Sequence, residues 1–397
     1  MHTIVALCVA AVPCGPPMDE RQSPGPERAR TYLTSLVGAS RVPGIEYVVV
    51  DATGIQFEYH GGWADIRRQA PVDAGTTMMG YSMSKTITAI AVLQLVEAGK
   101  VGLDDSVGRY VDELPYGPGV TVRQLIVHTS GIPNPIPLRW IHPAARHDTF
   151  DEEAALATVL REHHRLSFEP GAKYAYSNIA YWLLGTIVER ASGQAFPPYV
   201  AEHIVRPLAV TPRELGYVVA DPAHHATGYL EKYSLMNLVK GFLIDRDLIG
   251  EYTGPWLELG GHYLNGPAFG GLVGTARGFG AFLQDQLRPR SAILDDTTRR
   301  LLYAPQRTTQ GSAIAMTLGW HIGELDGRRY FYKEGGGGGF RSMMRVYPAH
   351  GIATVVMTNA TGFGVRECLD TVDVQFLVQT TRGPVRAPSP SVTKRPG

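Results

Sequence analysis

Ser82 and Lys85 stand three residues apart at the start of an apolar run, YSMSKTITAIAVLQLVEAG, that occupies residues 81–99. In a helix, this spacing puts both side chains on one face of the first turn, within reach of each other. The rest of the run is nearly all apolar, so we expect a buried helix whose N-terminal dipole favours negative charge at Ser82. Burial and nearby positive charge both lower the pKa of a lysine, and a neutral lysine can accept the proton of a serine nucleophile.

An ordinary structural explanation competes with this one. Ser82 or Ser84 would simply cap the helix, and Lys85 would be a surface residue of its first turn. The Ser-x-x-Lys pattern also occurs at Ser391 to Lys394, in a proline-rich tail where no chemistry is expected. The motif alone is therefore weak, and its context has to decide.

Two further short motifs follow in the chain: Tyr-Ser-Asn at 176–178, within EPGAKYAYSNIAYWLLGTIVERASG, and Lys-Glu-Gly at 333–335, within YFYKEGGGGGF. The order Ser-x-x-Lys, Tyr-x-Asn, Lys-x-Gly resembles the active-site triplet of the serine β-lactamase-like and penicillin-binding-protein superfamily. The Tyr-x-Asn version is similar to class C β-lactamases and family VIII carboxylesterases. The phrases LIVHTSGI at 125–132 and FGGLVGTARGFGAFLQDQL at 269–287 also resemble that family, and the resemblance covers about residues 32–376.

Other matches to the short motifs lack this context. Tyr263-Leu264-Asn265 and Lys100-Val101-Gly102 fit the second and third patterns, but their surroundings do not resemble the family. The resemblance therefore selects the motifs that begin at Ser82, Tyr176 and Lys333.

By this resemblance, Ser82 attacks an acyl carbonyl and carries the acyl group as an ester. Lys85 and Tyr176 move the protons, with Lys333 as a further catalytic group, and which group takes the serine proton is left open. A phenol titrates near ~10, so Tyr176 acts as a base only if nearby ammonium groups favour its phenolate. The alternative is that Tyr176 is a structural aromatic residue in a tyrosine-rich loop.

The resemblance also implies the substrate contacts. The backbone N–H groups of Ser82 and Gly336 would form an oxyanion hole, in a glycine-rich strand edge that includes Gly335 and lets a substrate approach the backbone. Asn178 would orient the acyl side chain, and its alternative role is to cap the helix that begins near Ile179. Within the same family context, we interpret His128 as a structural histidine buried at a helix end.

Glu334 departs from the family pattern, because β-lactam-processing members usually carry threonine or serine at this position, facing a substrate carboxylate. A glutamate there would repel a carboxylate, which favours neutral or cationic acyl substrates over β-lactams. Side chains alternate along a strand, however, so Glu334 would have no such effect if it faced away.

The elements that must position these residues can be read from hydrophobic periodicity. Strand patterns occur at 45–51 and 55–62, and again at 317–324, 328–334, 340–348 and 351–359. Helical patterns fill the middle, at 83–99, 121–128, 151–165, 178–191 and 275–287, and an amphipathic segment follows at 364–380. Strands at both ends and helices between them predict one sheet built from both ends of the chain, with a helical part inserted.

The expected fold class is α/β (α+β), a β-lactamase/DD-peptidase-like fold with an antiparallel sheet flanked by helices. We expect an α/β domain from residues 28–80 and 312–381, and a mostly helical domain from residues 81–311. Residues 1–27 would be a disordered or signal-like N-terminus, and residues 382–397 a disordered tail. Residues 229–263 fit either a core helix or a mobile lid, and burial statistics favour the core.

Composition excludes several classes of function. Thirty-seven basic and thirty-seven acidic residues give no net charge, which argues against nucleic acid or an anionic membrane as a partner. No stretch reaches the roughly 18 to 20 apolar residues of a membrane span. The adjacent pairs at His163 and His224 lack zinc-site spacing, so we expect no metal, and no nucleotide-binding glycine motif or other cofactor signal is present. The weak N-terminal signal favours a cytoplasmic location over export by a narrow margin.

Three hypotheses follow. The first, with an esterase as the favoured type, is a serine hydrolase that acts on small ester, amide or peptide substrates through a Ser82 acyl-enzyme. The second is an acyltransferase that passes the acyl group to an amine or alcohol in natural-product biosynthesis. The third is a non-catalytic binding or sensor domain with the same fold. The oligomeric state does not follow from the sequence.

Overall fold

The computed structural model describes residues 24–135 and 140–377 of the 397-residue chain. The expected C-terminal tail and its Ser-x-x-Lys pattern lie outside the described residues, as do residues 1–23 of the expected N-terminal flank. Helix α1 (Gly25–Gly38) begins two residues before the expected limit of that flank at residue 27. Pro26 lies in the first turn of α1, where a proline costs no hydrogen bond, and a proline-rich stretch can therefore start a helix.

The main sheet contains strands from both ends of the chain, as predicted. Its order is β12-β13-β14-β15-β1-β2-β3, and every neighbouring pair is antiparallel. The seven strands are β1 (Gly44–Asp51), β2 (Ile55–Asp65), β3 (Ala70–Pro71), β12 (His321–Leu325), β13 (Arg328–Gly337), β14 (Phe340–Tyr347) and β15 (Ile352–Thr358).

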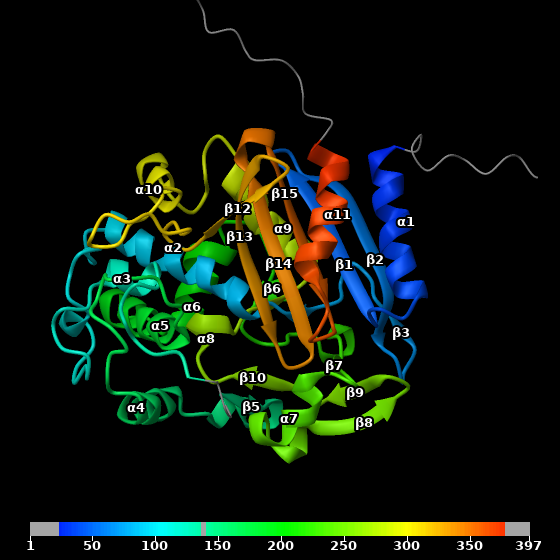
Figure 1. Cartoon of the computed structure of the whole chain (residues 1–397), viewed down its shortest axis with the longest axis horizontal. Coiled ribbons are helices and arrows are strands. Elements are labelled where there is room, and N and C mark those ends of the chain that lie inside the picture. The colour runs from blue at the N-terminus through cyan, green and yellow to red at the C-terminus, as the bar shows by residue number, and fades with distance from the viewer. Residues whose placement is uncertain (1–23, 136–139, 378–397) are drawn as a thin grey trace, which may run out of the picture.

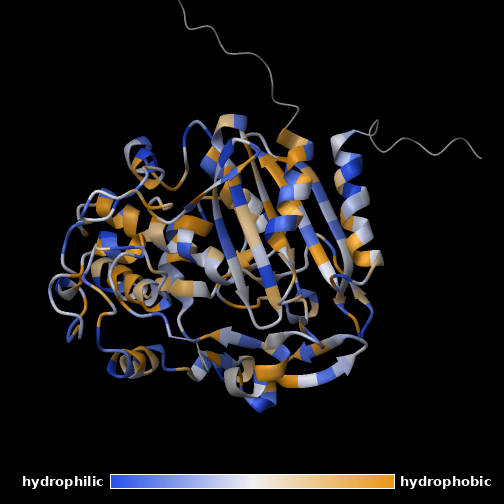
Figure 2. Ribbon diagram, viewed as in Figure 1, coloured by the Kyte–Doolittle hydropathy of each residue, from blue (hydrophilic) through white to orange (hydrophobic). Residues whose placement is uncertain are grey.

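Helices cover both faces of this sheet. Helix α9 (Ala276–Leu287) packs against β1, β14 and β15 on one face, while α1 and α11 (Val365–Leu377) pack together over the other (Figure 1). Hydrophilic and hydrophobic residues are interspersed along α1 and α11, as expected for helices that each bury one side (Figure 2). The residue limits of the two domains stay a prediction.

The remaining helices lie beside the sheet and hold the predicted nucleophile. Helix α2 (Ser84–Glu97) is buried from Ser84 to Leu93 and packs against α5 (Asn178–Ser192) and α8 (Pro267–Gly270). This confirms the expected buried helix. The others are α3 (Val122–Ile126), α4 (Glu152–Glu162), α6 (Phe196–Val200) and α10 (Asp296–Leu302). The short strands β4 (Met78–Met79), β6 (Leu215–Gly216) and β11 (Val273–Gly274) form a small sheet, and β4 precedes α2 in the sequence.

Residues 229–263 form neither a core helix nor a simple lid. The strands β7 (Gly228–Glu231), β8 (Ile249–Thr253) and β9 (Trp256–Leu259) form a separate antiparallel sheet, and α7 (Leu235–Leu243) lies between β7 and β8 in the sequence. To the left of it in Figure 1, β10 (His262–Leu264) pairs with β5 (Ile141–Pro143). Tyr233 and Leu238 are 91% and 80% exposed, so the favoured assignment of this segment to the core is wrong for these side chains.

None of the helices in the described ranges has the length and apolar character needed to cross a membrane.

Candidate active site

Ser82 lies in a short 3-10 turn, η1 (Tyr81–Met83), between β4 and α2. Tyr81 has a φ of 44°, in the left-handed region that a tyrosine rarely adopts, so the backbone is strained directly before Ser82. The buried Tyr81 side chain holds this conformation. Its hydroxyl donates to the carbonyl oxygen of Gly338 at 2.6 Å and lies 3.0 Å from Nε2 of His262. The turn therefore fixes Ser82 against the end of β13.

The Ser82 hydroxyl lies between two groups that can transfer a proton. Its Oγ is 2.7 Å from the Tyr176 hydroxyl oxygen and 3.0 Å from Nζ of Lys85. Lys85 belongs to the first turn of α2, and Tyr176 precedes α5. Because α2 and α5 pack together, residues almost a hundred positions apart meet at one hydroxyl.

Lys85 is fully buried, and its amine has specific partners. Its Nζ donates to Oδ1 of Asn178 at 2.8 Å and to the carbonyl oxygen of Phe269 at 2.5 Å. Burial lowers the pKa of Lys85 well below its ordinary value, and the neighbouring Lys333 lowers it further. The site therefore favours a neutral amine beside Ser82.

Tyr176 is held in its neutral form as well. Burial raises the pKa of the Tyr176 phenol, and the hydrogen bond with Ser82 offsets this only in part. The amines of Lys85 and Lys333 lie 4.9 and 5.8 Å from the centre of its ring. Burial therefore disfavours the phenolate that Tyr176 would need in order to act as a base.

Lys333 projects from β13 into the same site. It is 1% exposed, and burial lowers its pKa to about 7. Within the described part of the chain, its Nζ has no hydrogen-bond partner. An amine without a partner at this depth is costly, which favours a role in the site over a role in stability.

The glycines that follow Lys333 allow close contact with the serine turn. A Cβ on Gly335 would lie 2.0 Å from the carbonyl oxygen of Gly80, so a side chain is excluded there. Gly336 lines the same cavity as Ser82. The assignment of the Ser82 and Gly336 N–H groups to an oxyanion hole stays a prediction.

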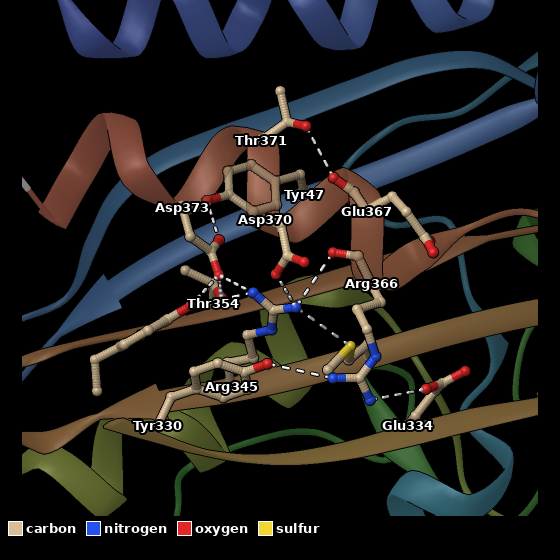
Figure 3. Close-up of polar contacts among 12 residues, drawn as sticks. Tyr47, Tyr330, Glu334, Arg345, Thr354, Arg366, Glu367, Asp370, Thr371 and Asp373 are labelled. Atoms are coloured by element: carbon tan, nitrogen blue, oxygen red, sulfur yellow. Dashed lines mark hydrogen bonds and ion pairs between the residues drawn. The ribbon is translucent and has the colours of Figure 1, made fainter. Parts of the chain in front are cut away.

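Glu334 lies on the opposite face of β13 from Lys333, beneath α11 (Figure 3). Its carboxylate forms ion pairs with Arg341 of β14 and with Arg366 of α11, the latter at 3.6 Å. It is not among the residues that line the cavity at Ser82. The two guanidinium groups offset its charge, so the repulsion of substrate carboxylates expected from the sequence has no direct geometric basis.

Asn178 points its amide oxygen at Lys85, and the helix cap is a different residue. Oγ of Ser177 accepts a hydrogen bond from the backbone N–H of Ala180 at 3.1 Å, which caps α5. The capping role considered for Asn178 is therefore filled by Ser177. The Asn178 side chain is free to position the amine and to line the cavity.

His128 contacts the site more closely than its assignment as a structural histidine implies. It is fully buried just after α3, and its ring lies 4.5 Å from the ring of Tyr176. Its Nδ1 accepts a hydrogen bond from the Ser177 backbone at 3.2 Å. Burial, with help from Lys333, lowers its pKa well below the ordinary value, so the imidazole is neutral.

A cavity of about 210 Å³ opens beside Ser82, and its walls are mostly apolar. Asn178 and the backbone at 336–338 line it near the serine. Lys85, Tyr176 and Lys333 are not among the residues that line it. The apolar walls are formed by Trp140, Ile141, Leu230, Ile244, Leu259 and Phe269, among others.

Among residues 24–135 and 140–377, no group of three or more His, Cys, Asp or Glu side chains is arranged to hold a metal ion. The site described above contains no donor set of that kind. The expected absence of a metal stays a prediction.

The alternative Tyr-x-Asn match at 263–265 belongs to β10 and the residue after it. Tyr263 accepts a hydrogen bond from the Val219 backbone, Asn265 contacts His142, and only Leu264 of this motif lines the cavity beside Ser82.

Sequence comparison identifies the family. A family model described as Beta-lactamase matches residues 29–378, and the chain belongs to this family. Penicillin-binding protein 4* of Bacillus subtilis (strain 168) is 25% identical over 319 residues, which cover 78% of this chain and 67% of that protein. The chain spans only about 40% of the length of another curated relative, protein flp of Staphylococcus aureus (strain MW2), at 25% identity over half of this chain.

Comparison with solved structures confirms the expected fold. A penicillin-binding protein homologue from Pyrococcus abyssi, described as octameric, has a TM-score of 0.72 at 20% identity, covering 89% of this chain and 78% of its own. D-amino acid amidase from Ochrobactrum anthropi SV3 scores 0.70 at 20% identity and covers 88% and 98%. EstCE1, described as a hydrolase with promiscuous acyltransferase activity, scores 0.65 at 20% identity and covers 89% and 98%.

Proposed function

We propose that this protein is a serine hydrolase that forms an acyl-enzyme on Ser82 and acts on ester substrates. The observation that carries the proposal is the contact of the Ser82 hydroxyl with both Lys85 and Tyr176, at 3.0 and 2.7 Å. Membership of the Beta-lactamase family supports it, as do the amidase and hydrolase named among the similar structures.

The contacts of Lys85 favour this residue as the base. A neutral amine has two N–H donors and one lone pair. Asn178 Oδ1 and the Phe269 carbonyl oxygen, at 2.8 and 2.5 Å, accept the two N–H groups. The lone pair is then left to face the Ser82 hydroxyl and can accept its proton.

Hydrolysis of an ester through the Ser82 acyl-enzyme consumes only the ester and water. Ser82 Oγ bonds to the acyl carbon while its proton passes to Lys85. The bond from the acyl carbon to the leaving oxygen breaks, and that oxygen takes a proton through the Tyr176 hydroxyl, which the Lys85 ammonium replenishes. Water then hydrolyses the Ser82 ester by the same proton route in reverse.

An activity screen tests this proposal. We expect turnover of short-chain p-nitrophenyl esters, and the screen includes nitrocefin and D-amino-acid amides. Lys85→Ala should lower kcat/KM by about 10²- to 10⁴-fold, which is the usual contribution of a positioned base. Tyr176→Phe should also lower kcat/KM while leaving the thermal unfolding temperature close to that of the wild type.

Three results would redirect the proposal. Nitrocefin cleavage faster than ester turnover would indicate a β-lactamase. Release of a transferred product, rather than the free acid, when an alcohol or amine competes with water would indicate an acyltransferase. A wild type that turns over no substrate would favour the binding or sensor hypothesis.

A further inference from the structure

The position of the proton-transfer groups decides which half of a substrate enters the cavity. A leaving oxygen must be protonated, so it has to lie near Tyr176, which does not line the cavity. The acyl group then points the other way, past Asn178 and Gly336, which do line it. The cavity is therefore the site of the acyl group.

We propose that this cavity selects apolar acyl groups of medium length that carry no positive charge, so that the substrates are esters of apolar carboxylic acids. The inference rests on the proposed function and adds the substrate class. The floor of the cavity is built by Leu230 of β7 and Leu259 of β9, which are 1% and 5% exposed. Trp140 and Phe269, whose rings are 5.7 Å apart, form another wall.

The one charged side chain among the described residues that line the cavity is Lys240 of α7. Its Nζ donates to the backbone oxygen and to Oδ1 of Asn237, at 3.0 and 2.7 Å. Neutral acceptors leave its positive charge uncompensated. An acyl group that carries an ammonium is thus disfavoured, so the cationic substrates that the sequence also allowed are not expected.

Asn237 fixes the wall that carries Lys240. It is 2% exposed, and its Nδ2 donates to the backbone oxygens of Glu231 and Lys232, at 3.1 and 3.2 Å. The Tyr252 hydroxyl donates to its Oδ1 at 3.0 Å. Asn237 therefore ties α7 to the strands β7 and β8, so this side of the cavity is held in place by buried polar contacts.

Helix α7 also offers a matched pair of positions for a test. Met236 lines the cavity and is 39% exposed, so it lies at the rim. Leu238, two residues further on, is 80% exposed and does not line the cavity. The same substitution at the two positions separates an effect on the cavity from an effect on the surface of α7.

The experiment measures kcat/KM for p-nitrophenyl acetate, butyrate, hexanoate and 6-aminohexanoate with the wild type, Met236→Glu and Leu238→Glu. Each methylene buried in the cavity should raise kcat/KM about fourfold, so hexanoate should exceed acetate by at least tenfold. The wild type should discriminate against 6-aminohexanoate relative to hexanoate. Met236→Glu should reduce the preference for hexanoate over acetate, and Leu238→Glu should leave it unchanged.

The outcomes separate this inference from the proposed function. Equal kcat/KM for acetate and hexanoate, in an enzyme that forms a fluorophosphonate adduct on Ser82, overturns the inference and leaves the function standing. An equal loss of chain-length preference in Leu238→Glu and Met236→Glu also overturns it, because the surface of α7 would then be responsible. Absence of the Ser82 adduct and of all turnover overturns both.

Discussion

At the scale of single residues, the site depends on two lysines that share one buried space with Tyr176. Burial lowers the pKa of Lys85 and raises that of Tyr176, so the two candidate bases would lose their protons in different pH ranges. If neutral Lys85 is the base, the acylation rate should rise with pH and reach its plateau well below pH 10.5, the ordinary pKa of a lysine. Stopped-flow measurement of p-nitrophenol release in the first turnover gives this profile.

The phenolate alternative makes the opposite prediction. Burial raises the pKa of Tyr176 above its ordinary value of 10.0, so a phenolate base would require the rate to keep climbing above pH 10. A plateau that survives in Lys85→Ala would also contradict Lys85 as the base, because the titrating group would then be another residue.

We expect the buried amine of Lys333 to lower the free energy of unfolding. Its pKa is about 7 in the folded chain and 10.5 ordinarily, so between these values the unfolded chain binds more protons. Stability therefore increases as the pH rises from about 7 to 10.5, and the full penalty remains below pH 7. Lys333→Met should raise the free energy of unfolding at pH 7 by about 1–4 kcal/mol.

Urea unfolding at pH 7 and pH 10 checks this prediction, and Lys333→Met should also lose esterase activity. Lys100→Met is the control, because Lys100 is exposed and its substitution should change stability by less than about 0.5 kcal/mol. A Lys333→Met variant less stable than the wild type at pH 7 would show that the amine contributes to stability.

At the scale of elements, a buried ion pair joins α11 to the main sheet (Figure 3). Arg345 of β14 and Asp373 of α11 are both fully buried and 3.3 Å apart, and Tyr47 and Tyr347 donate hydrogen bonds to Asp373 at 2.9 and 2.7 Å. Because Arg366 of the same helix pairs with Glu334, this packing supports the strand that carries Lys333.

Asp373→Asn should therefore destabilise the fold by about 3–5 kcal/mol, because it leaves the Arg345 guanidinium poorly compensated in the core. Asp370→Asn is the matched control. Asp370 also pairs with Arg345, at 2.7 Å, but its side chain is 40% exposed, so the loss should be about 0–1 kcal/mol. Thermal and urea unfolding measure both variants, and equal losses would refute the dominant role of burial.

At the scale of the whole molecule, the sequence predicts the main sheet and the long helices because their apolar periodicity is strong. The helix that follows Ser82 is a long apolar run, and the strand of Lys333 lies among strand patterns bounded by turn residues, so the elements that position both residues could be predicted. Residues 229–263 could not, because their strands are only three to five residues long and their apolar content fits either a core helix or a lid. Their place beside the active site depends on contacts between residues far apart in the sequence, such as the pairing of β5 with β10.

The candidate site was likewise predictable only in part. The short motifs give Ser82, Lys85, Tyr176 and Lys333, since each is defined by local spacing. The carbonyl oxygen of Phe269 and the ring stacking of His128 on Tyr176 carry no motif signal, because they are backbone and packing contacts. The orientation of Glu334 depends on strand register, which a single sequence does not fix.

Intact-protein mass spectrometry after exposure to a fluorophosphonate tests most directly whether Ser82 is an activated nucleophile. One covalent adduct should form on the wild type and map to Ser82, with none on Ser82→Ala and much slower labelling of Lys85→Ala. An adduct that persists in Ser82→Ala, or a folded wild type that remains unlabelled, would contradict the account.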